Sequence, residues 1–131
     1  MSELFSADWM SNYAEAWNNE PELAGELEKI DFNSTIGYGF PDDEQPAGVL
    51  VVEKGKAVKA GSYSGEALNW DLRASNDSWQ KWMGEGIGMT GLGIAFTSGK
   101  LKFKVGDYKS MLKDPRMAGP FIKSFSVMGK A

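Results

Sequence analysis

Residues 95–115 read AFTSGKLKFKVGDYKSMLKDP. In the middle of this stretch, the apolar side chains of Leu101, Phe103 and Val105 alternate with lysines. A period of two predicts a strand with one apolar face and one solvated face. The chain after it has a helical period, and prolines divide it into one short and one longer helix. This stretch therefore predicts a strand that leads into helices at the end of the chain.

The start of the chain has a helical period instead. Residues 5–19 predict a helix in which Ser6 serves as the N-cap and Asp8 suits the first turn. Residues 21–30 predict a second helix that begins at Pro21. The apolar face of the first helix is formed by Phe5, Trp9, Tyr13 and Trp17.

Between these ends the pattern changes to a period of two. Residues 32–40 predict a strand, and residues 48–61 predict a hairpin with a tight turn at Lys54-Gly55. Residues 67–75 predict a half-buried antiparallel strand, because every second residue is apolar. Asp71 and Arg73 lie on the polar side of that strand, where we expect a surface ion pair.

A glycine-rich stretch, residues 84–93, contains G-x-G-x-x-G at Gly86, Gly88 and Gly91. A dinucleotide-binding loop needs a strand before this motif and a long helix after it. Here the preceding residues 75–83 have a helical pattern, and the following helix would be short. We therefore interpret the glycines as a flexible connector and not as a phosphate-binding loop.

Helices at both ends and antiparallel strands between them define an α+β fold, and the length predicts a single domain over residues 1–131. The chain has 14 basic and 18 acidic residues, a net charge of −4. That balance argues against a nucleic-acid partner and against adsorption to anionic membranes by total charge. No apolar stretch is long enough to span a bilayer, so no stable membrane insertion is expected.

The chain contains neither cysteine nor histidine. Serine-histidine and cysteine-histidine catalysis and cysteine- or histidine-ligated zinc are therefore excluded. The absence of cysteine is consistent with a cytoplasmic location, and the first residues have no signal-peptide pattern. We expect no cofactor and no metal site.

Residues 95–115 resemble the signature of the sterol carrier protein family of non-specific lipid-transfer domains. That signature typically runs Ala-Phe-Met-Ser-Gly-Lys-Leu-Lys-Ile and continues with Gly-Asp and a helix. Thr97 replaces the usual methionine, and Val105 resembles a one-residue insertion before Gly106 and Asp107. The residues that match in order are Ala95, Phe96, Ser98, Gly99, Lys100, Leu101 and Lys102.

The resemblance implies a five-stranded, mainly antiparallel sheet that about five helices cover on one face. It also implies an apolar tunnel between the sheet and the C-terminal helices. Such a tunnel would take a fatty acid, a fatty acyl-CoA, a phospholipid or a sterol-like lipid, and no catalytic residues are implied. The glycine-rich connector would then lie near the mouth of the tunnel.

The late half of the chain is rich in methionine and aromatic residues, which suit an adaptable apolar pocket. Each of them alone is better interpreted as core, and only the set indicates a lipid site. Lys100, Lys102 and Lys104 could meet a carboxylate or a CoA phosphate, but a solvated strand face is the simpler interpretation. The expected lipid-binding residues are Trp79, Trp82, Met83, Met89, Phe96, Leu101, Phe103, Met111, Leu112, Phe121 and Phe125.

Two alternatives to a lipid carrier remain open from the sequence. One is an assembly or accessory module that partners an enzyme, or forms a homodimer, and has no ligand of its own. The other is a histidine-free proton-transfer enzyme of the ketosteroid isomerase type. Tyr38, Tyr63 and Asp71 are its candidate groups, although no spacing distinguishes them.

Overall fold

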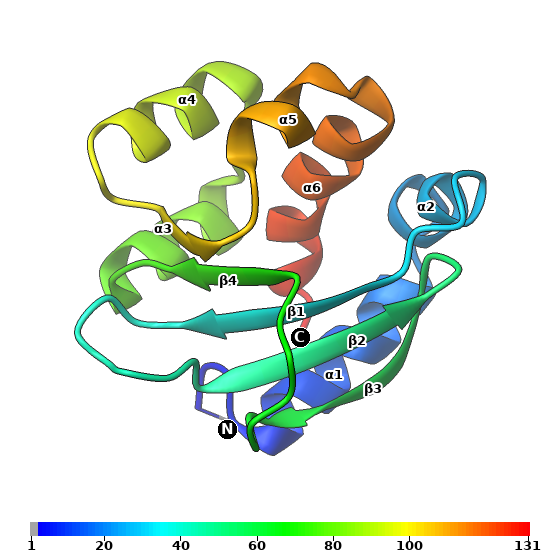
Figure 1. Ribbon diagram of the computed structural model, residues 1–131, viewed down its shortest axis with the longest axis horizontal. Helices are drawn as coiled ribbons and strands as arrows, with labels where there is room; N and C mark the ends of the chain where they lie inside the picture. Colours follow the sequence, from blue (N-terminus) through cyan, green and yellow to red (C-terminus); the bar gives the residue numbers. More distant parts are fainter. Residues whose placement is uncertain (1–2) are drawn as a thin grey trace.

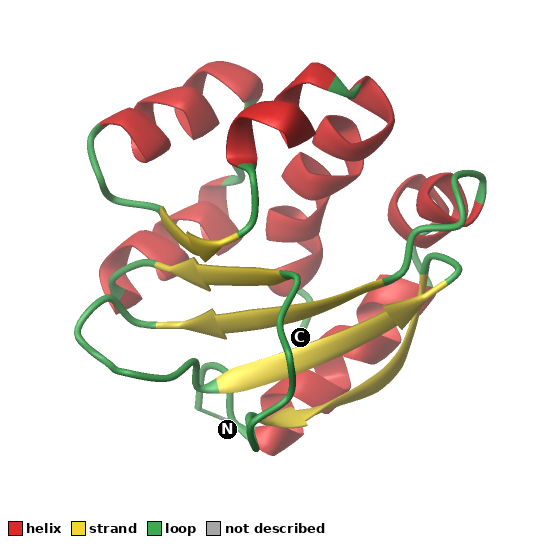
Figure 2. Ribbon diagram, viewed as in Figure 1, coloured by secondary structure: helices red, strands yellow, loops and turns green. Residues whose placement is uncertain are grey.

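The computed structural model describes residues 3–131. Helices and strands follow one another as the sequence predicts, with two helical segments first, four strands next, and one more strand among the later helices (Figures 1 and 2). In chain order they are α1 (Ala7–Asn18), the π-helical turn η1 (Pro21–Gly25), α2 (Glu26–Glu28), β1 (Ser34–Gly39), β2 (Gly48–Glu53), β3 (Lys56–Ser62), β4 (Trp70–Arg73), α3 (Asn76–Glu85), α4 (Met89–Thr97), β5 (Lys102–Val105), α5 (Tyr108–Lys113) and α6 (Pro115–Met128).

The five strands form one sheet in the order β3-β2-β1-β4-β5. Every neighbouring pair is antiparallel except β1 and β4, which run parallel, with Ile36 opposite Trp70 and Tyr38 opposite Leu72. The predicted α+β class with a five-stranded, mainly antiparallel sheet is therefore confirmed. The prediction of an antiparallel, half-buried strand at residues 67–75 was wrong in two respects. Strand β4 pairs in parallel with β1, and it is mostly buried because it lies inside the sheet.

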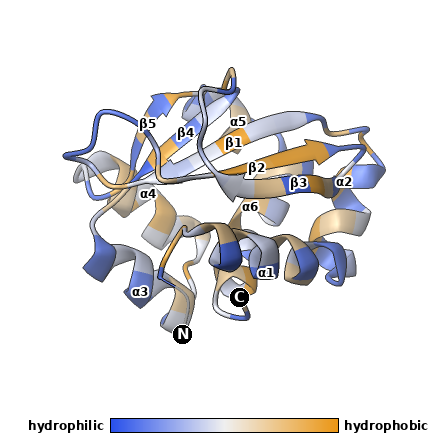
Figure 3. Cartoon of the chain, turned by 90° about the horizontal axis from the view of Figure 1, so that it is seen from below, coloured by the Kyte–Doolittle hydropathy of each residue, from blue (hydrophilic) through white to orange (hydrophobic). Residues whose placement is uncertain are grey.

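Helices α1, α3 and α6 lie on one face of the sheet (Figure 3). Helix α1 packs under β2 and β3, and α6 packs against α1, α3 and η1. The predicted N-cap is present, since the backbone N–H of Trp9 donates to the hydroxyl of Ser6. Trp9, Tyr13 and Trp17 form the buried apolar face of α1 as predicted, whereas Phe5 is buried but precedes the helix, with a φ of 65°.

The hairpin between β2 and β3 has the predicted turn. Lys54 and Gly55 have φ angles of 51° and 83°, which suit the two central residues of a type I′ turn. Gly55 is buried, and its carbonyl accepts a hydrogen bond of 2.9 Å from the indole N–H of Trp17. The turn thus fixes the hairpin to α1.

Strand β5 departs from strict alternation. Leu72 pairs with Phe103 and Asp71 pairs with Val105, so Lys104 is an extra residue in the ladder. As a result Leu101 is buried and Phe103 half-buried, but Val105 is 39% exposed. The expectation that Val105 shares the buried face was wrong, because this bulge turns it outward. The bulge also accounts for the one-residue insertion that the sequence suggested.

Asp71 and Arg73 form a buried ion pair, so the prediction of a surface pair was wrong. The guanidinium of Arg73 donates to both carboxylate oxygens of Asp71, at 2.6 and 3.0 Å. Its remaining nitrogen, Nη1, donates to the backbone carbonyls of Phe40 and Asp43, at 3.0 and 2.7 Å. The loop after β1 therefore covers this face of β4 and is fixed there by one side chain.

The glycine-rich stretch follows a helix and not a strand. Helix α3 ends at Glu85, Gly86 has a φ of 77°, and α4 begins at Met89. Since no strand precedes the motif, the structural context of a dinucleotide-binding loop is missing.

Replacing Gly106 by alanine should destabilise the fold by about 2–3 kcal/mol. Gly106 has a φ of 111°, and an added Cβ would overlap the indole ring of Trp70. Gly84 lies in α3, and no neighbouring side chain comes within 4 Å of the methyl group that alanine would add there. Gly84→Ala should therefore stabilise the fold by about 0.5–1 kcal/mol. Urea denaturation of both variants measures the difference, and equal effects would contradict this reason for glycine at position 106.

Candidate functional site

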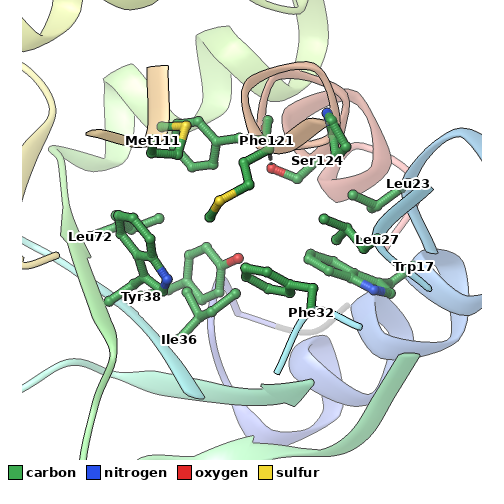
Figure 4. A pocket seen from close by; sticks show the side chains of 13 residues that line it. Trp17, Leu23, Leu27, Phe32, Ile36, Tyr38, Leu72, Met111, Phe121 and Ser124 are labelled. Carbon is green, nitrogen blue, oxygen red and sulfur yellow. Dashed lines mark hydrogen bonds between the residues drawn. The ribbon is translucent and has the colours of Figure 1, made fainter. Parts of the chain in front are cut away.

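An apolar cavity lies between the sheet and the helices, under β1 and β4 and beside α6 (Figure 4). Its free volume is about 40 Å³, and about 470 Å³ lies between the lining atoms when the open mouth is included. The first value is room for about three water molecules. The lining residues are Trp17, Leu23, Leu27, Phe32, Ile36, Tyr38, Trp70, Leu72, Met111, Met117, Pro120, Phe121 and Ser124.

The sheet supplies one wall of the cavity. Ile36 and Tyr38 of β1 are two residues apart, so both side chains point to the helix-covered face. Leu72 of β4 lies opposite Tyr38 in the parallel pair and faces the same way. The parallel pairing of β1 and β4 thus creates this wall.

The C-terminal helices supply the opposite wall. Met117, Phe121 and Ser124 are spaced by four and three residues, which places them on one face of α6. Met111 of α5 lies at the same wall. Helix α6 starts sharply at Pro115, where the carboxylate of Asp114 accepts a hydrogen bond from the backbone N–H of Arg116.

Hydroxyl groups are the polar feature of this lining. The Tyr38 hydroxyl lies 3.0 Å from that of Tyr13, and both side chains are buried. Ser124 donates to the Phe121 carbonyl. Burial raises the pKa of Tyr38, and it raises the pKa of Tyr13 well above its ordinary value, with the neighbouring Tyr38 adding to the effect. Both phenols are therefore neutral at physiological pH.

The two buried phenols make stability fall at high pH. In the unfolded chain a tyrosine ionises near pH 10, and in the fold these two ionise only above that value. Their contribution is complete below about pH 10 and is lost as the pH rises further, by about 1 kcal/mol per tyrosine and pH unit. Urea denaturation as a function of pH measures this loss. The double variant Tyr13→Phe/Tyr38→Phe should show a smaller loss, and an unchanged loss would contradict the assignment.

No aspartate, glutamate, lysine or arginine of the described residues lines the cavity. A charged group inside it would lose its hydration without finding a counter-ion, at a cost of several kcal/mol. The cavity therefore suits the apolar part of a ligand, and any ionised part has to remain at the mouth. Figure 4 shows the Tyr38 and Ser124 oxygens as the polar atoms among the labelled side chains, apart from the indole nitrogen of Trp17.

Two of the eleven expected lipid-binding residues, Met111 and Phe121, line this cavity. Phe103 lies one ring further out, with its centroid 5.9 Å from that of Phe121. Phe96 also contacts Phe103, at 5.9 Å, and stacks on Tyr108 at 3.9 Å. These rings separate the cavity from a shallow surface groove beside α5.

The other expected residues lie elsewhere. Trp79, Trp82 and Phe125 pack on one another in the core, with centroids 5.6 to 6.1 Å apart. Leu101 is fully buried, and Met83 and Leu112 are half-buried. Met89 is 50% exposed on α4. The structure thus does not bring these seven residues to the cavity.

Most of the actual lining was not among the residues expected from the sequence. The apolar faces of Leu23 and Leu27, and of Phe32, Ile36 and Tyr38, were visible as periodic patterns. Periodicity gives the buried face of each element but not which faces leave space between them. One signal could have identified the lining: the apolar faces of these early segments had to pack against the methionine-rich helices at the C-terminus.

The groups considered for a proton-transfer enzyme are not assembled into a site. Tyr38 faces the helices, whereas Asp71 is on the opposite side of the sheet with Arg73. The Tyr63 hydroxyl donates to the backbone carbonyl of Glu66. Within residues 3–131, no helix combines the length and the apolar character needed to cross a membrane.

Neither a protein-family model nor a curated protein matches the sequence. Solved structures do match. The chain superposes on a crystal structure of sterol carrier protein 2 with a TM-score of 0.78 and 19% identity, over 98% of this chain and 99% of the other. A solution structure from Thermus thermophilus, described as a possible sterol carrier protein, gives 0.64 and 18%, over 98% and 92%.

A third structure, named UbiJ-SCP2 ubiquinone synthesis protein, gives a TM-score of 0.60 and 12% identity, over 91% of this chain and 86% of the other. At these identities the likeness concerns the fold. The chain therefore folds as a sterol carrier protein 2-like domain, which confirms the resemblance seen in residues 95–115.

Proposed function

We propose that this domain binds and carries a long-chain hydrophobic ligand, namely a fatty acid, a fatty acyl-CoA, a phospholipid or a sterol-like lipid. The observation that carries the proposal is the uncharged, apolar cavity between the sheet and α6. Its position is the one that the sterol carrier resemblance implies for a lipid tunnel. The domain acts by binding and release, without catalysis, and a cytoplasmic location stays a prediction.

Affinity comes from burying the chain of the ligand. Each methylene group that leaves water contributes about 0.8 kcal/mol, so a long chain needs no specific polar partner. The free volume of about 40 Å³ is too small for such a chain in this conformation. Binding therefore displaces side chains of the helical wall, where Met111 and Met117 are unbranched and adopt new shapes easily.

One further function has a specific observation in its favour. The named relation of a structural neighbour to ubiquinone synthesis, together with the small free volume, supports an accessory module that assembles with a biosynthetic enzyme. In that case the apolar surface would bind another chain and the cavity would stay closed. Ligand binding distinguishes the two functions.

Tryptophan fluorescence tests the proposal, because Trp17 and Trp70 line the cavity. A fatty acid brominated near its methyl end should quench part of the emission in a saturable way, with about one ligand per chain. The same fatty acid without bromine should leave the emission nearly unchanged when added alone, and should restore the emission when it displaces the brominated one. If the brominated fatty acid causes no saturable quenching at concentrations below its micelle formation, the carrier function is rejected.

A further inference from the structure

Three elements bring hydroxyl groups to one place in the otherwise apolar cavity. The Tyr38 hydroxyl of β1 lies 3.0 Å from the Tyr13 hydroxyl of α1. Burial raises the pKa of Tyr13, and the nearby Ser124 hydroxyl of α6 acts in the opposite direction by hydrogen bonding. Tyr13, Tyr38 and Ser124 therefore form one cluster, and two of its members, Tyr38 and Ser124, line the cavity.

The hydroxyl cluster lies at the inner end of the cavity. All three of its side chains are at most 3% exposed. The half-buried lining residues, which mark the side that opens to solvent, are Phe32, Trp70, Met117 and Phe121. Figure 4 shows the Tyr38 oxygen directed at the space between the sheet and α6. A chain-like ligand whose charged end stays at the mouth thus brings its other end to Tyr38.

Tyr38 has hydrogen-bonding capacity beyond its contact with Tyr13. Each phenol has one O–H donor and lone pairs that accept. If Tyr13 donates to Tyr38, the proton of Tyr38 is left for the cavity. If Tyr38 donates to Tyr13, the lone pairs of Tyr38 are left instead. A ligand hydroxyl both donates and accepts, so it suits either arrangement.

The group that meets Tyr38 has to be uncharged. The described residues that line the cavity include no basic side chain, so a carboxylate at the inner end would have no counter-ion. The phenols do not supply a charge either, because burial raises the pKa of both. A hydroxyl or carbonyl oxygen carries no charge, and burying it is costly only when it has no hydrogen-bond partner.

We infer that Tyr38, held by Tyr13 and beside Ser124, determines specificity for ligands whose buried end carries a hydroxyl or carbonyl oxygen. This inference rests on the proposed carrier function and adds a ligand class to it, namely long-chain molecules with a second, uncharged polar group away from the mouth. A purely apolar end leaves the remaining bonding capacity of Tyr38 unused, whereas an oxygen at that end supplies the partner.

Fatty acids with and without a terminal hydroxyl test the inference. Hexadecanoic acid is compared with ω-hydroxyhexadecanoic acid, and shorter pairs down to decanoic acid follow, because only some lengths reach Tyr38. Each acid competes with the brominated fatty acid in the fluorescence measurement. At one length or more, the wild-type chain should bind the hydroxy acid within about threefold of its unsubstituted partner, because Tyr38 compensates the lost hydration.

The variant Tyr38→Phe removes that compensation. At the same length, its affinity for the hydroxy acid should fall to about a tenth to a hundredth of its affinity for the unsubstituted acid. The readout is the ratio of the two affinities within one variant, so a general disturbance of the cavity cancels. Tyr63→Phe is the matched control, because the Tyr63 hydroxyl donates to the Glu66 carbonyl and does not line the cavity. Its ratio should equal that of the wild-type chain.

Two results would overturn the inference. One is a wild-type chain in which the terminal hydroxyl weakens binding tenfold or more at every length, a result that does not depend on whether Tyr38→Phe folds. The other is an equal affinity ratio in the wild-type chain and in Tyr38→Phe. In both cases the unsubstituted acids still displace the quencher, so the carrier function stands. If the brominated acid itself causes no saturable quenching, the carrier function fails, and the inference fails with it.

Discussion

Replacing Arg73 by methionine should lower the free energy of unfolding by about 3–5 kcal/mol. Arg73 is fully buried and supplies four hydrogen bonds, two to Asp71 and two to the loop that follows β1. Without it, the Asp71 carboxylate is left in a buried position with no positive charge beside it. The carbonyls of Phe40 and Asp43 each lose one donor as well. Chemical denaturation measures the change directly.

Arg116 is the matched control for this variant. It makes an equivalent pair with Asp114, but on the surface, so Arg116→Met should cost less than about 1 kcal/mol. The double variant Asp71→Leu/Arg73→Met removes both charges and should recover much of the stability lost in the single variant. If Arg73→Met lowered the free energy of unfolding as little as Arg116→Met, the buried ion pair would not be what fixes the loop after β1.

Replacing Met117 by aspartate should weaken binding of a long-chain fatty acid by about a hundredfold or more. Met117 is half-buried on α6 and lines the cavity, so a carboxylate there still reaches water in the free protein. A bound acyl chain would cover that carboxylate and strip its hydration, at a cost of several kcal/mol. Competition against the brominated fatty acid measures the affinity.

Ile122 provides the control on the same helix. It is half-buried like Met117 but does not line the cavity. Ile122→Asp should therefore disturb stability to a comparable degree while leaving the affinity for the fatty acid within a few fold. Equal loss of affinity in both variants would mean that the ligand does not occupy this cavity.

Local patterns predicted the elements that depend on local interactions. The apolar face of α1 from Trp9 to Trp17 and the turn at Lys54-Gly55 both follow from spacing and turn chemistry within one segment. The strand at residues 102–105 was also visible, and the motif around it led to the correct fold.

Errors arose where the outcome depends on contacts between distant segments. The pattern at residues 67–75 alternates as in a half-exposed strand, but β4 pairs in parallel with β1 and is covered by the loop after β1. Asp71 and Arg73 occupy polar positions of that pattern and are nevertheless buried, because each satisfies the charge of the other. Alternation alone cannot reveal a covering loop.

The sequence predicted an apolar cavity but not most of the residues that line it. An apolar space beside the C-terminal helices was expected, and Met111 and Phe121 lie there. The other wall comes from residues far earlier in the chain, such as Ile36 and Tyr38. Which two apolar faces leave a space between them depends on the packing of the whole domain.

Native mass spectrometry of the purified protein, followed by extraction of whatever is bound, tests the carrier function most directly. The proposed function predicts a long-chain molecule at about one per chain, released by organic solvent and identified as one lipid class. A chain that carries nothing, and that also shows no saturable quenching by the brominated fatty acid, would contradict it. The fold would then stand, and the accessory module would become the better account of this domain.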